Sequence, residues 1–107
     1  MKKYEIVKEH KDFDDIIASG KYTKNKYVVI YNKESEFEYP RFGVAVGKKV
    51  GHAVTRNKLK RILRMILTNN KKLFKKNHDY IIIGKRSALE VDYSTLENSI
   101  KEIISGD

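Results

Sequence analysis

The sequence contains no cysteine, which excludes disulfide bonds and metal sites built from thiolates. Long apolar runs are also missing: the longest are a few residues, as in 27–31, against the ~20 residues that a membrane-spanning helix needs. The first residues, Met1 to Glu5, are charged and lack the apolar segment of a signal peptide. We therefore expect a soluble, cytoplasmic protein with no membrane partner.

Proline is scarce too, since Pro40 is the only one, and no stretch rich in proline, glycine or serine divides the chain. The length of 107 residues is near that of one domain, and 40% apolar residues suffice for a modest core. We predict a single domain that covers residues 1–107.

Acidic side chains are missing from residues 39–78, where twelve lysines and arginines occur. The whole chain carries a net charge of +9, yet the residues outside this segment have eleven basic side chains against fourteen acidic ones. Positive charge is thus concentrated in one region, which is typical of a polyanion-binding surface.

The hydrophobic pattern predicts a small α/β sandwich. The expected elements are a helix over residues 8–19, strands over 26–31, 41–47 and 79–84, a basic helix before the last strand, and a final helix from about 93 to 105. The polar segment 32–40 is interpreted as a hairpin loop. Ser94 and Glu97 have the spacing of a capping box.

The strand over residues 41–47 has two different faces. Its large side chains, on one face, are Phe42, Val44 and Val46, and its small residues, on the other, are Gly43, Ala45 and Gly47. Because the second face has almost no side-chain bulk, we expect another element to approach it closely.

The basic helix also divides into two faces when residues are placed 100° apart. Its apolar arc, which we expect to pack on the sheet, contains Leu59, Ile62, Leu63, Ile66 and Leu67. Its opposite arc of hydrogen-bond donors contains Asn57, Lys60, Arg61, Arg64 and Thr68, with Arg56 at the N-terminal edge.

The arginines of this helix favour geometric recognition of phosphate. The chain has eighteen lysines but only five arginines, and three of the five are Arg56, Arg61 and Arg64. Arginine offers a planar, bidentate fork, whereas lysine acts as a point charge. A merely solvated face is the usual alternative, but such a face normally mixes charges of both signs. A membrane surface is less favoured, because the apolar arc is needed for the core.

The sequence has no recognisable catalytic or metal-binding motif. His10, His52 and His78 lie far apart and not at the spacing of metal ligands, and there is no glycine-rich phosphate loop. The acidic cluster of residues 12–15 is interpreted as favourable charge in the early turns of a helix. The protein is therefore expected to assist catalysis and not to perform it.

The segment from Lys48 to Arg64, KKVGHAVTRNKLKRILR, closely resembles the arginine–asparagine–arginine motif region of the bacterial ribonuclease P protein subunit. The helix with Phe13, Gly20, the strand 41–46 and the strand 79–83 also stand where that family has its corresponding elements. The resemblance implies a ribosomal-protein-like α+β two-layer sandwich of order αβββαβα. It also implies a left-handed βαβ crossover, although the general rule favours the right-handed one.

The resemblance further implies a function. In that family the protein is the cofactor of a catalytic RNA that removes the 5′ leader of precursor tRNA by Mg²⁺-dependent hydrolysis. By resemblance, the residues that contact the RNA subunit are Lys48, Lys49, Arg56, Asn57, Lys58, Lys60, Arg61 and Arg64. Those that line the leader-binding cleft are Phe13, Ile17 and Tyr31. No residue is predicted to be catalytic, and the metal is expected mainly on the RNA.

Two residues depart from the family pattern. Lys58 replaces the usual second arginine of the motif, and Ile17 replaces a common aromatic residue. Two other hypotheses remain open from the residues alone: a non-catalytic module that binds structured RNA without regard to a 5′ leader, and a helix-mediated DNA-binding protein.

Overall fold

The computed structural model describes residues 1–106 and contains four strands and three α-helices. In chain order the main elements are α1 (His10–Ser19), β1 (Lys21–Lys24), β2 (Val28–Glu34), β3 (Arg41–Val46), α2 (Ala53–Asn69), β4 (His78–Gly84) and α3 (Tyr93–Gly106). Short 3-10 helices are η1 (Lys3–Glu5), η2 (Lys48–Val50), η3 (Lys71–Leu73) and η4 (Arg86–Glu90). The order αβββαβα is the one that the resemblance implied, whereas the hydrophobic pattern alone had not indicated β1.

The four strands form one sheet in the order β1-β2-β4-β3. β2 pairs antiparallel with β1 and with β4, whereas β3 pairs parallel with β4. β2 and β3 are therefore not neighbours, and the predicted hairpin over residues 32–40 is wrong. The hairpin lies one strand earlier, between β1 and β2, where Asn25 Oδ1 accepts the backbone N–H groups of Tyr27 and Val28.

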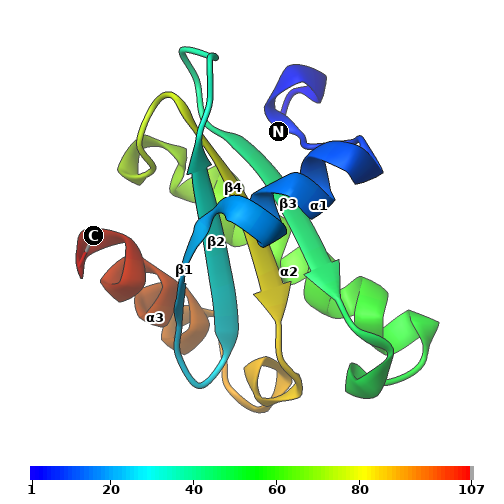
Figure 1. Cartoon of the computed structure of the whole chain (residues 1–107). Coiled ribbons are helices and arrows are strands. Elements are labelled where there is room, and N and C mark those ends of the chain that lie inside the picture. The colour runs from blue at the N-terminus through cyan, green and yellow to red at the C-terminus, as the bar shows by residue number, and fades with distance from the viewer. Residues whose placement is uncertain (107) are drawn as a thin grey trace.

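Helices cover both faces of the sheet (Figure 1). The larger core packs α2 and α3 against alternate residues of the strands, which include Val28, Ile30, Phe42, Tyr80 and Ile82. The smaller core packs α1 against the other face, where Ile81 is fully buried. The predicted apolar arc of α2 faces the larger core: Leu59, Leu63, Ile66 and Leu67 are fully buried, and Ile62 is half-buried.

The crossover from β3 through α2 to β4 is left-handed, as the resemblance implied. In Figure 1, α1 lies in front of the sheet, α2 lies behind it, and the parallel strands run downward with β3 to the right of β4. A right-handed connection, the rule in ~98% of parallel crossovers, would place β3 to the left of β4 in this view.

Gly43 allows α1 to approach the sheet closely. A Cβ atom on Gly43 would lie 2.7 Å from Phe13 Cε2 and 2.7 Å from Ile81 Cδ1. The predicted close approach to the small-residue face of this strand is thus confirmed, and the approaching element is the first helix.

The start of α3 differs from the prediction. Asp92 caps the helix, because its Oδ1 accepts the backbone N–H of Thr95 at 2.8 Å. Hydrogen bonds from the side chain and then the backbone of Thr95 lower the pKa of Asp92. Glu97 instead accepts a hydrogen bond from Asn70 Nδ2 at 2.9 Å and joins α3 to the end of α2. Within residues 1–106, no helix combines the length and apolar character that a membrane crossing requires.

Glu5 ties the N-terminal segment to the rest of the fold. Its carboxylate accepts the backbone N–H of Lys2 at 2.9 Å and Lys71 Nζ at 3.0 Å, and these interactions, the first above all, lower its pKa. The tie holds the segment whose Val7 N–H donates to Phe42 O at the edge of β3.

We predict that Glu5→Gln destabilises the protein by ~1–2 kcal/mol at pH 7, because hydrogen bonds to a charged group are lost. A lowered pKa in the folded state stabilises the protein above the ordinary glutamate pKa, and this contribution is lost as pH falls. The urea midpoint of the variant should therefore be lower than that of the parent at pH 7, and the two midpoints should agree near pH 3. Glu36→Gln, at an exposed carboxylate, is the matched control. Equal midpoints at pH 7 for the parent and Glu5→Gln would contradict the prediction.

Candidate nucleic-acid interface

The donor face of α2 lies at the surface. Asn57, Lys58, Arg61 and Arg64 are exposed, whereas Arg56 and Lys60 are half-buried. The side-chain ion pairs found in residues 1–106 are Lys33–Asp15, Arg41–Asp79 and Lys71–Glu5, and none of them uses a basic residue of α2. Within the described residues, the positive charges of this helix are therefore not paired with carboxylates.

The N-terminus of α2 adds backbone donors to this charge. The N-cap His52 makes no side-chain hydrogen bond to the helix, and the first turn contains no acidic residue. Gly51 turns the chain into the helix with φ +152°, a conformation that residues with a side chain rarely adopt. Free N–H groups and the helix dipole make such an end suitable for an anion. Lys48 and Lys49 are exposed directly before this turn, in η2.

Arg56 carries one polar atom that the protein does not satisfy. Its Nε is buried and has no hydrogen-bond partner among the described residues. A buried donor without an acceptor costs ~1–3 kcal/mol. A ligand that supplies an acceptor to Arg56 Nε would remove this cost.

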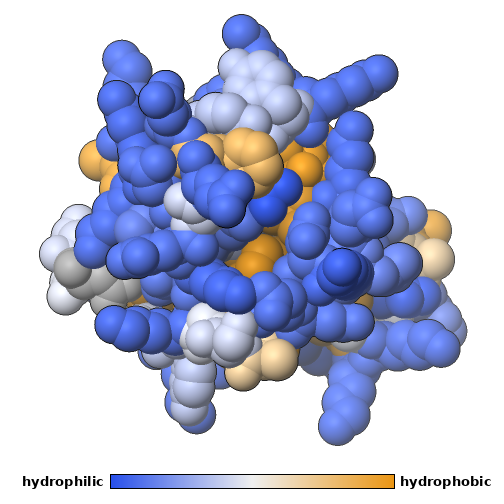
Figure 2. Space-filling view, turned by 45° about the horizontal axis from the view of Figure 1, so that its top comes forward, coloured by the Kyte–Doolittle hydropathy of each residue, from blue (hydrophilic) through white to orange (hydrophobic). Residues whose placement is uncertain are grey.

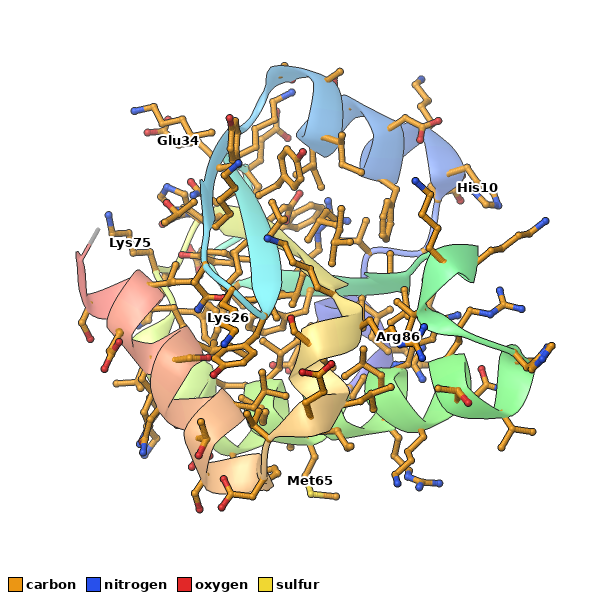
Figure 3. The ribbon with its side chains drawn as sticks, turned by 90° about the horizontal axis from the view of Figure 1, so that it is seen from below. His10, Lys26, Glu34, Met65, Lys75 and Arg86 are labelled. Carbon is orange, nitrogen blue, oxygen red and sulfur yellow. The ribbon has the colours of Figure 1, made fainter. Side chains whose placement is uncertain are left out.

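A second basic segment lies beside Lys48 and Lys49, and the sequence reasoning missed it. Lys85 and Arg86 follow β4, and Val46 of β3 is aligned with Gly84 of β4, so both basic pairs leave the same end of parallel strands. Figure 3 shows the exposed Arg86 at the end of the sheet nearest the viewer, together with Lys26. The missed signal was the parallel pairing, which brings together residues that follow two distant strands.

The three predicted cleft residues lie together on the opposite face of the sheet from α2. Phe13 and Ile17 of α1 and Tyr31 of β2 pack around the small core with Ile83, and all are half-buried. Tyr31 also contacts Tyr22 of β1, with ring centroids 5.5 Å apart. The structure thus brings apolar and aromatic side chains to one partly open surface.

A surface hollow joins this region to α2. Its lining includes Phe13, Gly43 and Val44 on one side and Arg64 on another, with the N-terminal segment above. Figure 2 shows apolar surface gathered in a hollow on the side that includes α1, surrounded by hydrophilic side chains. An apolar floor and a basic rim suit a nucleic-acid strand, whose bases are flat and whose backbone is anionic.

A buried charged pair lies where β3 and β4 begin, near Asp12 of α1. Arg41 donates two hydrogen bonds to Asp79, from Nε at 2.8 Å and from Nη2 at 2.5 Å, and both side chains are largely buried. Asp79 raises the pKa of Arg41 above its usual value, and Asp12 on α1 adds to this effect. Arg41 therefore stabilises the fold internally and is not available as a phosphate ligand.

The acidic residues do not gather into a metal site. In the part of the chain that the structure describes, no group of three or more acidic or histidine side chains could hold a metal ion. Of the acidic residues near the N-terminal half of α1, Asp15 pairs with Lys33, which lowers the pKa of Asp15. Asp15 is thus engaged within the fold, and the described residues offer no ready cluster of three metal ligands.

Comparison with known proteins agrees with this geometry. The sequence matches the Ribonuclease P family over residues 1–106. It is 41% identical to the ribonuclease P protein component of Mycoplasma capricolum, over 97% of this chain and 96% of that protein.

Solved structures give the same result. The RNase P protein from Thermotoga maritima superposes with a TM-score of 0.87 and 31% identity, over 96% of this chain and 97% of that one. A Staphylococcus aureus RNase P protein mutant, described as having defective mRNA degradation activity, also gives 0.87, with 29% identity over 96% and 87% of the two chains. The chain therefore belongs to the bacterial ribonuclease P protein family.

Proposed function

We propose that this protein docks on the catalytic RNA of ribonuclease P through α2 and holds the 5′ leader of precursor tRNA on the α1 side of its sheet. Membership of the family associates the chain with ribonuclease P and tRNA 5′ maturation. The observation that carries the finer proposal is the hollow in which Arg64, from the basic helix, and Phe13, from the aromatic surface, lie together.

The docking half of the proposal rests on charge that the fold leaves unpaired. Exposed donors on α2 and the free helix N-terminus offer hydrogen bonds to phosphate, and the lysines before the helix add charge. We include the exposed Arg86 in this surface, because it leaves the sheet at the same end as Lys48 and Lys49. Lys85 is half-buried and its Nζ donates to Asn25 O at 2.8 Å, so we do not count it among the phosphate ligands. Contacts of this kind position an RNA backbone without reading its sequence.

The leader half rests on the small core. Single-stranded RNA binds proteins by stacking its bases on aromatic rings and by placing phosphates near basic side chains. Phe13 and Tyr31 supply the rings, and Ile17 supplies an apolar contact without a stacking surface. Unpaired bases of a leader fit this surface better than a duplex, whose bases are already stacked.

Mg²⁺, in this proposal, belongs to the RNA. The metal would activate water and stabilise the charge that develops on the phosphate during hydrolysis. The protein residues hold the two RNA molecules in register and reduce their mutual repulsion. Less Mg²⁺ is then needed to bring them together, because basic side chains replace part of the screening by cations.

We predict that the purified protein lowers the Mg²⁺ concentration at which a bacterial ribonuclease P RNA removes the leader from precursor tRNA. The measurement is the midpoint of a Mg²⁺ titration of cleavage, with and without protein, for substrates with long and short leaders. The benefit should be larger for the long leader.

Three controls make the result decisive. Protein without RNA should cut nothing, and cleavage of precursor tRNA by the protein alone would overturn the assignment of catalysis to the RNA. An equal benefit for both leaders would favour a general RNA-binding module. Binding to duplex DNA as tight as to RNA in the same salt would favour a DNA-binding protein.

A further inference from the structure

Tyr22 is an exposed aromatic residue that the proposed function does not use. Its side chain is 59% exposed, although it lies in a strand and contacts another tyrosine. A ring of this size in water exposes apolar surface that the fold has not buried. The question is what could cover it.

The pairing of the strands places Tyr22 in line with the leader-binding surface. Residues paired directly across neighbouring strands share one face of a sheet. One such row crosses all four strands, from β1 to β3, and consists of Tyr22, Tyr31, Ile81 and Gly43. Phe13 lies on Gly43 at one end of this row, and Tyr22 forms the other end.

α1 covers only part of the row. Ile81 is fully buried under α1 and Tyr31 is half-buried, whereas Tyr22 lies on the edge strand and is exposed. Lys24, two residues further along β1, is also exposed and shares the face of Tyr22. An aromatic ring with a lysine two residues away is a suitable pair for one nucleotide, with the base on the ring and the phosphate near the ammonium.

We propose that Tyr22 extends the leader-binding surface onto β1 and stacks on a leader base farther from the cleavage site than the base held by Tyr31. This inference rests on the proposed function. The order of contacts follows from the sheet: the basic helix lies against β3 and β4, and β1 is the opposite edge. A leader that leaves the RNA subunit near α2 reaches Phe13 first and Tyr22 last.

The residues under α1 leave room for a further stacking contact. Ile17 is apolar but has no aromatic ring, so it offers no stacking surface there. Tyr22 supplies a ring at the neighbouring edge strand, one strand spacing beyond Tyr31, at ~4.8 Å. The aromatic surface is thereby moved outward along the sheet.

The test uses the reconstituted holoenzyme and precursor tRNA with single abasic sites along the leader. For the parent protein, an abasic site at the base on Tyr22 should weaken substrate binding about fivefold or more. In Tyr22→Ser, intact substrate should bind about as weakly, and the same abasic site should cost nothing further. Tyr22→Phe, which keeps the ring, should behave like the parent.

Tyr4→Ser is the matched control, because Tyr4 is 50% exposed and contacts Tyr39 outside the row. Leader-dependent binding by the parent with no change in Tyr22→Ser would overturn this inference and leave the proposed function standing. Loss of affinity in Tyr22→Ser that is equal for leaderless and long-leader substrates would also overturn it. If the parent holoenzyme instead bound leaderless and long-leader substrates equally well, the proposed function itself would be overturned.

Discussion

Replacing Arg61 and Arg64 together with alanine should weaken binding to the ribonuclease P RNA about 100-fold at physiological salt. Both side chains are exposed on α2 and make no ion pair within the described residues. A hydrogen bond to a charged group contributes ~1.5–3 kcal/mol, and exposure favours the lower figure, which corresponds to about tenfold for each residue. The measurement is a binding titration of the labelled RNA.

The salt dependence of the same titration separates phosphate contacts from damage to the fold. About five phosphate contacts give a log–log slope of roughly −3.5 to −4.5, and each lost contact reduces it by ~0.7–0.9. The double variant should therefore have a slope that is flatter by ~1.4–1.8. Lys21→Ala with Lys101→Ala removes the same charge from β1 and α3, which lie on the opposite side of the molecule from β3 (Figure 1). An unchanged slope in the arginine variant, or an equal change in the lysine variant, would remove α2 from the interface.

The central helix could be predicted from the sequence because its signal is local. Hydrophobic residues at helical spacing decide which side of α2 is buried, and the donors occupy what remains. The small-residue face of β3 was local information too. Alternation along one strand predicted a close neighbour, and Gly43 under Phe13 confirmed it. The spacing could not show that the neighbour is α1, because nothing in β3 identifies its partner.

The pairing of the strands could not be predicted in the same way. β4 lies between β2 and β3, so the segment 32–40 connects strands that are not neighbours. Chain order favours a hairpin in this segment. In the structure, however, the chain crosses behind the sheet through α2 after β3, and β4 then enters the sheet between β2 and β3. The basic pair Lys85 and Arg86 was missed for this reason. Tyr22 was missed as well, because β1 is four residues long and its burial pattern is almost entirely exposed.

Arg41 shows the limit of counting arginines. The twelve basic residues of segment 39–78 predicted a polyanion-binding surface, yet Arg41 of that segment is used inside the fold. Arg41 is the first residue of β3, Asp79 is the second residue of β4, and the two are aligned in the parallel pairing. They are 38 residues apart in the sequence, so the pair becomes visible only once the strands are known to be parallel.

Asp79→Asn should therefore destabilise the protein by ~3 kcal/mol, although the substitution changes almost no volume. The carboxylate accepts both Nε and Nη2 of Arg41, whose side chain is only 16% exposed. An asparagine has one oxygen, so its amide group would place N–H donors against the N–H donors of the guanidinium. Because ~1 kcal/mol lowers the melting temperature of a domain of this size by ~4–8 °C, a fall of more than ~10 °C is expected in thermal unfolding.

The two partners can be tested as a pair. Removing one member of a buried ion pair leaves the other charge without its counter-charge, whereas replacing both with apolar residues is often nearly neutral. The double variant Arg41→Met with Asp79→Leu should therefore lose less free energy of unfolding than the two single variants lose together. The difference should be 1 kcal/mol or more, on the order expected for contacting residues. Strictly additive losses would mean that the two side chains act independently. In that case the stability of this end of the sheet would come from the stacking of Arg41 on Phe37, 4.4 Å from the ring centroid, and Phe37→Ala would produce the larger fall.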